Sequence, residues 1–114
     1  MAQFTVYSNA TVIGYSELES GDAPMGVAFG AFKPTDEYSM IRHECLNNHL
    51  NQDALKLSVH TNAGLVIPCA GVSILDYSAE AGTELIELNI LGIPYQIYNE
   101  LFPEHVASYN QQFH

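Results

Sequence analysis

Two cysteines and five histidines are the residues best suited to bind a metal ion. His43 and His49 are six residues apart, or about 120° around a helix, so they cannot bind one ion from the same face. Cys45 and His49 are four apart and could do so. A zinc site needs further ligands, however, and no Cys-x-x-Cys pair supplies them. A buried Cys45 and a surface or hydrogen-bonded His49 are the simpler interpretation, and we predict no metal or other cofactor.

Cys45, Cys69 and Ser73 are the candidate nucleophiles, each requiring a histidine partner. Ser73 stands in a segment, residues 71–75, that lacks the second glycine of a nucleophile elbow. Cys69 follows Pro68 between two expected strands, and nothing nearby in the sequence would lower the pKa of its thiol. We therefore interpret these residues first as core or sheet-edge positions.

Asp76, Glu80 and Glu84 cluster around one expected turn, and paired carboxylates can act as general acid and base. Glycoside hydrolysis needs two carboxyl groups at a set separation across a cleft, typically with aromatic side chains that stack on the sugar. The chain has seven tyrosines but no tryptophan, and the spacing alone does not place a pair of carboxylates. A solvated acidic turn is the favoured interpretation.

The composition of the chain restricts its partners. Its 114 residues correspond to one domain, 1–114. Charged residues make up only 14% of the chain, and thirteen Asp and Glu oppose just Lys33, Arg42 and Lys56, giving a net charge of −10. Nucleic acids and anionic membranes are therefore unsuitable partners. A cationic protein partner is compatible with this charge, although solubility alone also explains it.

The first residues do not form a charged and then apolar leader, and no apolar run approaches the ~20 residues that span a bilayer. These features predict a soluble, cytoplasmic protein. In that compartment Cys45 and Cys69 are expected to be reduced thiols, although the pair could in principle form one disulfide.

The N-terminal quarter predicts a β-hairpin followed by an acidic loop. Phe4 and Val6 alternate with polar or amphipathic neighbours, residues 8–10 interrupt the alternation, and residues 11–18 resume it. The next segment should be exposed, and we interpret its carboxylates as possible partner-binding residues. They are Glu17, Glu19 and Asp22.

Residues 25–32 predict a strand with one face of small residues, Gly26, Ala28 and Gly30. Such a face allows a close approach to the backbone. A neighbouring side chain is the simpler occupant, and a small ligand is the alternative. The glycines do not form a phosphate-binding loop, because neither Gly-x-Gly-x-x-Gly nor Gly-Lys-Ser/Thr is present.

A central helix is expected over about 35–50. Thr35 or Asp36 can cap its start, and Tyr38, Ile41 and Cys45 recur at helical spacing, with Leu46 and Leu50 beside them. Residues 55–60 then alternate as a half-buried strand, and residues 65–67 are expected to form a strand that stops at Pro68.

The rest of the chain is organised around residues 64–98, its densest apolar and β-branched stretch. Residues 72–77 are apolar on both faces, which favours a central strand. Ile86, Leu88 and Ile90 alternate with Glu87 and Asn89, which predicts a strand with one buried face. Residues 78–82 form the turn between the two strands.

The C-terminal residues predict a short amphipathic helix that docks through aromatic side chains. Tyr98, Leu101 and Phe102 have helical spacing, Pro103 can begin a new turn, and Val106, Tyr109 and Phe113 continue the pattern. The whole chain thus predicts an α+β fold: a mainly antiparallel sheet of six to eight short strands, curled or partly closed, with one central helix and a short C-terminal helix.

Three functional hypotheses follow. The favoured one is a non-catalytic binding or interaction protein, self-associating or not, whose acidic face meets a basic partner. That face lies around Glu17, Glu19 and Asp22 or around Asp76 to Glu87. An inhibitor or immunity-type protein for a cationic nuclease or toxin is a specific form. The second is a small-ligand protein with a pocket over Gly26–Gly30. The third is an enzyme that uses Cys69, His60 or Asp76. Many Tyr, Asn and Gln in a chain poor in charge favour protein contact.

Overall fold

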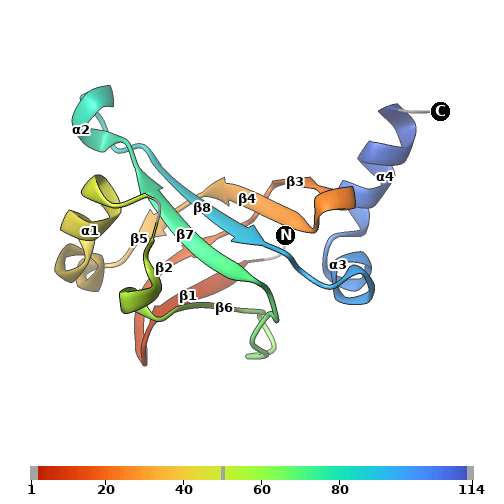
Figure 1. The fold of residues 1–114 in the computed structure, drawn as a ribbon, viewed down its shortest axis with the longest axis horizontal. Helices are drawn as coiled ribbons and strands as arrows, with labels where there is room; N and C mark the ends of the chain where they lie inside the picture. Colours follow the sequence, from red (N-terminus) through yellow and green to blue (C-terminus); the bar gives the residue numbers. More distant parts are fainter. Residues whose placement is uncertain (1–2, 50, 113–114) are drawn as a thin grey trace.

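The computed structural model describes residues 3–49 and 51–112, which form two four-stranded antiparallel sheets (Figure 1). One sheet has the strand order β5-β2-β1-β6 and the other β3-β4-β8-β7. The predicted α+β class and the predicted number of strands are confirmed. The strands are β1 (Phe4–Ser8), β2 (Thr11–Ser16), β3 (Ser20–Asp22), β4 (Val27–Ala31), β5 (Lys33–Pro34), β6 (Leu57–His60), β7 (Gly71–Asp76) and β8 (Ile86–Leu91).

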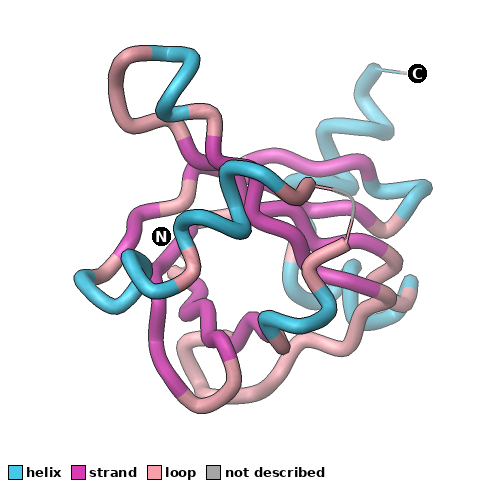
Figure 2. Tube along the Cα trace, turned by 60° about the vertical axis from the view of Figure 1, so that its left-hand side comes forward, coloured by secondary structure: helices cyan, strands magenta, loops and turns pink. Residues whose placement is uncertain are grey.

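Short helices connect and flank the sheets (Figure 2). None within the described ranges is both long and apolar enough to cross a membrane. The α-helices are α1 (Arg42–Asn47), α2 (Ser78–Ala81), α3 (Tyr95–Leu101) and α4 (Pro103–Gln112). The 3₁₀ helices are η1 (Ala23–Met25), η2 (Asp36–Met40) and η3 (Asp53–Leu55).

The predicted N-terminal hairpin is formed by β1 and β2. Asn9 in its turn has a φ of 55°, a left-handed conformation that asparagine tolerates better than most residues. Val6 faces Gly14 while Tyr7 faces Val12, so one extra residue, Ile13, bulges from β2. Ile13 is fully buried.

The chain passes from one sheet to the other three times, through residues 61–70 between β6 and β7 and at two tight corners. Leu18 lies between β2 and β3, is buried and has a φ of 46°. Phe32 lies between β4 and β5, and its N–H donates a hydrogen bond of 2.9 Å to the carbonyl of Ile86. These corners curl the sheets around one shared apolar core.

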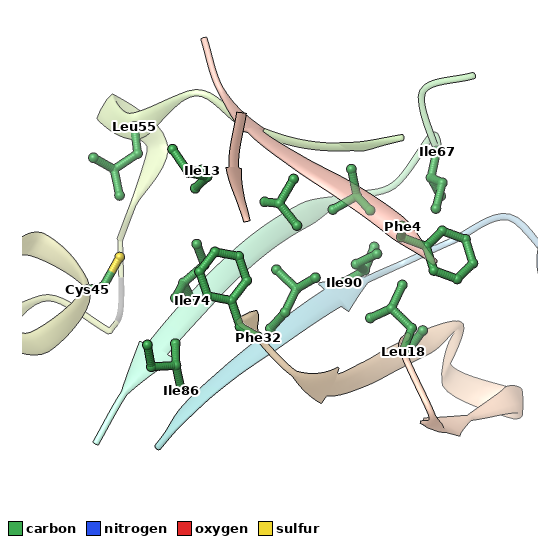
Figure 3. Packing of buried hydrophobic residues seen from close by; sticks show 14 of the residues in the cluster. Phe4, Ile13, Leu18, Phe32, Cys45, Leu55, Ile67, Ile74, Ile86 and Ile90 are labelled. Atoms are coloured by element: carbon green, nitrogen blue, oxygen red, sulfur yellow. The ribbon is translucent and has the colours of Figure 1, made fainter. Parts of the chain in front are cut away.

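Both sheets contribute inward side chains to this core (Figure 3). The alternation predicted for β8 is confirmed, because Ile86, Leu88 and Ile90 are buried while Glu87 and Asn89 are partly exposed. Burying six or more such branched side chains, each contributing about 1.5–3 kcal/mol, is the main stabilising term of the fold. Figure 3 labels Phe4, Ile13, Leu18, Phe32, Cys45, Leu55, Ile67, Ile74, Ile86 and Ile90 of this core.

The prediction that residues 72–77 form a central strand is wrong. β8 is internal to its sheet, and β7 is an edge strand. α1 lies against β7 (Figure 1), and Tyr38 and Arg42 contact Asp76 at the end of this strand. The strand expected at residues 65–67 is reduced to one bridge, between His60 and Val66, and the chain leaves the sheet before Pro68.

The helix expected over residues 35–50 is divided into η2 and α1. Ile41, between them, has φ −118° and ψ 1°, which interrupts the helical path. The apolar positions Tyr38, Ile41 and Cys45 are buried as expected. Only the continuity of the helix is wrong, because the 3₁₀ turn carries Tyr38 to a buried partner on β7. Leu50 lies outside the described residues.

The predicted C-terminal helix is present as two helices, α3 and α4. Tyr98 within α3 and Phe102 directly after it are buried, as the aromatic spacing predicts, but the predicted docking through Tyr109 is wrong, because Tyr109 is exposed. α4 buries no described side chain completely and projects from the body of the molecule (Figure 1). Phe113 lies outside the described residues.

Candidate functional site

Cys45 and His49, the residues that the sequence suggested as metal ligands, both pack against other parts of the protein. Cys45 is fully buried on α1, and burial raises the pKa of its thiol to about 11. The ring of His49 packs edge-on against Tyr77 at 5.3 Å between centroids. Within residues 3–49 and 51–112, no three His, Cys, Asp or Glu side chains are grouped so that they could hold a metal ion.

Asp76 is buried and is held by three neighbouring groups. Its carboxylate accepts hydrogen bonds from the Tyr38 hydroxyl at 2.6 Å and the Ser78 N–H at 2.9 Å, and it lies 3.7 Å from the Arg42 guanidinium. Glu80 and Glu84, the other two carboxylates of the predicted cluster, are exposed.

The surroundings of Asp76 set its charge and that of Tyr38. Burial alone would raise the pKa of Asp76, but hydrogen bonds from Ser78 and Tyr38, with the charge of Arg42, outweigh it and lower the pKa. Burial and the hydrogen bond to Asp76 raise the pKa of Tyr38 far above its usual range. The carboxylate therefore stays ionised and the phenol protonated, which suits a clamp between η2 and β7.

The remaining catalytic candidates are not brought together. Burial raises the pKa of the Cys69 thiol and makes it a poorer nucleophile. His60 packs against the ring of Tyr7 at 4.2 Å and lies 3.3 Å from the Ser58 hydroxyl. In the described part of the chain no hydrogen bond or ion pair joins Cys69, His60 and Asp76.

The small-residue face of β4 is approached by the protein's own groups. Ala28 is fully buried. A Cβ atom at Gly30 would overlap the side chain of Glu19, and one at Gly26, where φ is 66°, would meet the backbone of Ile93. The close approach that the sequence predicted is present, and Glu19 and Ile93 make it.

The three acidic candidates have different surroundings. Glu17 forms an ion pair of 3.6 Å with Lys33. Glu19 accepts a hydrogen bond of 2.9 Å from the Ala31 N–H. Asp22 is exposed at the end of β3. The expected acidic loop is thus partly a strand, because Ser20–Asp22 pairs with β4.

Two of these carboxylates line a cleft that we call the α4 cleft. It has a volume of about 570 Å³ and lies between the β3–β4 hairpin and α4. Its lining combines acidic, aromatic and neutral polar side chains. The lining residues are Glu19, Ser20, Gly21, Asp22, Phe29, His105, Ser108, Tyr109 and Gln112.

Two hydrogen bonds hold α3 and α4 against the β3–β4 hairpin and the corner before it, and one ring contact joins the two helices. The Tyr98 hydroxyl donates to the carbonyl of Val27 at 2.8 Å, and the His105 Nε2–H donates to the carbonyl of Leu18 at 2.8 Å. The imidazole of His105 stacks on Phe102 at 5.1 Å. Gly21 lies beneath, and a Cβ atom there would overlap both the Tyr98 hydroxyl and the His105 ring. Glycine at this position therefore lets the helices approach the strand.

Negative charge on the molecule is largely uncompensated. Of thirteen Asp and Glu, two, Glu17 and Asp76, form ion pairs. The other eleven (13 − 2) have no cationic partner among the described residues. Around the α4 cleft, burial raises the pKa of Tyr98 to about 12, and the negative charge of Asp22 is the second, smaller cause of this increase. The cleft is therefore an anionic environment with aromatic walls.

Sequence reasoning missed the aromatic half of the α4 cleft. Phe29 and Tyr109 are distant in the sequence and come together only because Tyr98 and His105 hold the helices on the hairpin. The small size of Gly21, which makes room for Tyr98 and His105, is the feature of the sequence that relates to this contact. A single sequence does not show which residues pack on that glycine. No family model, characterised protein or solved structure matches the chain.

Proposed function

We propose that this chain is a non-catalytic interaction protein that binds a basic segment of another protein in the α4 cleft. The proposal rests on one observation: the carboxylates of Asp22 and Glu19 and the rings of Phe29 and Tyr109 line the same cleft. A Lys or Arg side chain is attracted by carboxylates and packs its stem and charged head on aromatic faces. The volume of the cleft is large enough for side chains of a docked segment.

A more specific form of this function is inhibition. The chain would then mask a cationic nuclease or toxin by covering the basic surface that such a protein uses to bind phosphates. The net charge of −10 supports this form, because long-range attraction speeds the association of oppositely charged proteins.

Binding of a basic probe should depend steeply on salt. We expect octalysine to bind the protein in about 0.1 M salt and to bind about tenfold more weakly or worse in about 1 M salt, because the Debye length falls from about 10 Å to about 3 Å. Isothermal titration calorimetry measures the affinity. Binding that is indifferent to salt, or no binding at all, would contradict the proposed function.

The position of the charge should matter as well as its amount. Asp22→Asn removes one carboxylate from the cleft, and we expect it to weaken octalysine binding several-fold. Glu84→Gln removes one exposed carboxylate near α2, at the other end of the molecule, and serves as the matched control. Equal weakening by the two variants would place the binding outside the α4 cleft.

Self-association is a second candidate, favoured by an uncharged end of the molecule. Residues 23–32, 61–75 and 88–99 contain no Asp, Glu, Lys or Arg. They meet where the Ile93 N–H donates to the carbonyl of Gly26 at 2.9 Å and the Ala70 N–H donates to that of Leu91 at 2.8 Å. Large apolar side chains are exposed in these segments: Met25, Leu65, Val66, Leu91 and Tyr95.

A second copy could dock at this end without the like-charge repulsion expected elsewhere on a protein of charge −10. We expect a homodimer whose dissociation constant falls as the salt concentration rises, which is the opposite of the response expected for the basic probe. Met25→Glu should disrupt this dimer, because a two-fold symmetric contact places the new charge in the interface twice. Met40→Glu is the control, since Met40 is 67% exposed and Met25 68%. Sedimentation equilibrium measures the mass; a monomer at every salt concentration would rule the dimer out.

A further inference from the structure

At the outer edge of β7, the side chain of Gln52 forms the hydrogen bonds that a neighbouring strand would otherwise form. An edge strand presents N–H and C=O groups that can pair with another chain. Gln52 lies opposite this edge, between α1 and β6, and is 6% exposed. Its burial is unusual for glutamine and calls for hydrogen-bonding partners.

Those partners are the backbone groups of one β7 residue. The Ile74 N–H donates to Gln52 Oε1 at 2.8 Å, and Gln52 Nε2 donates to the Ile74 carbonyl at 2.7 Å. This is the reciprocal pair of bonds that a residue of an antiparallel neighbour would make. Gln52 Nε2 also donates to the Asn48 carbonyl at 2.9 Å, which ties the amide to the end of α1.

The edge has room beside it on one side of Gln52. A hollow of about 350 Å³ runs along Gly71, Val72 and Ser73. Val72 is two residues from Ile74, so its backbone groups point to the same outer side of β7. At the other end of β7, Arg42 of α1 reaches Asp76 and covers the strand.

We infer that Gln52 is an edge guard: its amide holds the Ile74 groups that a strand from a second copy of this chain would pair with. The guard closes the middle of an edge that Arg42 approaches at Asp76 and that the hollow leaves open along Gly71–Ser73, and the pairing of two β7 strands requires its displacement. Natural sheets commonly protect exposed edges against such edge-to-edge pairing.

Removing the guard should expose the edge. We expect Gln52→Met, which keeps the side-chain volume, and Gln52→Ala to convert the protein into β-sheet oligomers. Sedimentation velocity and thioflavin T fluorescence detect them. Ser8→Ala is the matched control, because it removes one buried hydrogen bond, from the Ser8 hydroxyl to the Leu55 carbonyl, on a strand already paired on both sides. The Gln52 and Ser8 variants are compared at temperatures at which the same fraction of each protein is folded.

The outcomes separate a guard from an ordinary stabilising contact. Oligomers in both Gln52 variants and none in Ser8→Ala support the inference; a monomeric, folded Gln52→Met protein overturns it. Hydrogen exchange of the unaltered protein covers the case in which both variants fail to fold. We expect the Ile74 amide to be protected and the Val72 amide to exchange rapidly, and equal rates for the two would also overturn the inference.

Discussion

Replacing Phe102 by alanine is expected to lower the free energy of unfolding by about 3–5 kcal/mol, the usual cost of truncating a buried phenylalanine. Phe102 is 2% exposed and joins three parts of the molecule. Its ring lies 5.5 Å from Phe4 of β1, 5.1 Å from Tyr98 of α3 and 5.1 Å from His105 of α4. Its removal leaves a cavity among three aromatic neighbours.

Urea denaturation of the Phe102→Ala protein measures the loss. Tyr95→Ala is the control, because it removes an aromatic side chain that is 76% exposed on the same helix, and surface changes of this kind usually stay within about 0.5 kcal/mol. A cost below about 1 kcal/mol for Phe102→Ala would mean that α3 and α4 are not anchored as described. The walls of the α4 cleft would then be uncertain as well.

Asp76→Ala is expected to destabilise the protein by about 3 kcal/mol at neutral pH. The change removes the acceptor of the Tyr38 hydroxyl and the Ser78 N–H and the partner of Arg42. The buried Tyr38 hydroxyl would then have neither this acceptor nor water as a hydrogen-bonding partner, which destabilises the folded state. Urea denaturation measures the difference, and Glu84→Ala, at an exposed site, should cost far less.

The same substitution should change how stability depends on pH. The folded-state pKa of Asp76 is lower than its usual value of about 3.9, so the unfolded chain binds the proton more tightly. The stabilisation from Asp76 is therefore present above about pH 4 and is lost as the pH falls toward the folded-state pKa. The difference in stability between the unaltered protein and Asp76→Ala should narrow in acid. A constant or widening difference would contradict the lowered pKa.

Local patterns predicted the elements whose stability is decided locally. The alternation around Leu88 located β8, the break at Asn9 located the first hairpin, and the aromatic spacing around Phe102 located the C-terminal helices. Period-two and helical patterns record which face of an element is buried; the faces of β8 and of α3 are buried as expected, whereas Tyr109 of α4 is exposed.

The errors arose where a contact between distant residues decides the structure. The residues of β7 are apolar on both faces, which is the pattern of a central strand, yet β7 lies at the edge of its sheet and contacts α1. The break at Ile41 accompanies the hydrogen bond from Tyr38 to Asp76, which are 38 residues apart. No periodicity in a single sequence records either relation.

The candidate site divides in the same way. Charge alone identified Glu19 and Asp22, and both line the α4 cleft, whereas Glu17 of the same segment is paired with Lys33. The cleft itself depends on the bond between the Tyr98 hydroxyl and the Val27 carbonyl, 71 residues apart. Composition can therefore suggest a basic partner, but only the packing of α4 defines where it would dock.

Chemical-shift mapping with octalysine tests the proposed docking of a basic segment at the level of single residues. The proposal predicts amide shifts concentrated at Ser20–Asp22, at Phe29 and along residues 105–112, with residues 78–84 around α2 unaffected. Shifts centred on residues 78–84, or spread evenly over all exposed carboxylates, would show that the acidic surface attracts the peptide without a defined site. Such a result would contradict binding in the α4 cleft.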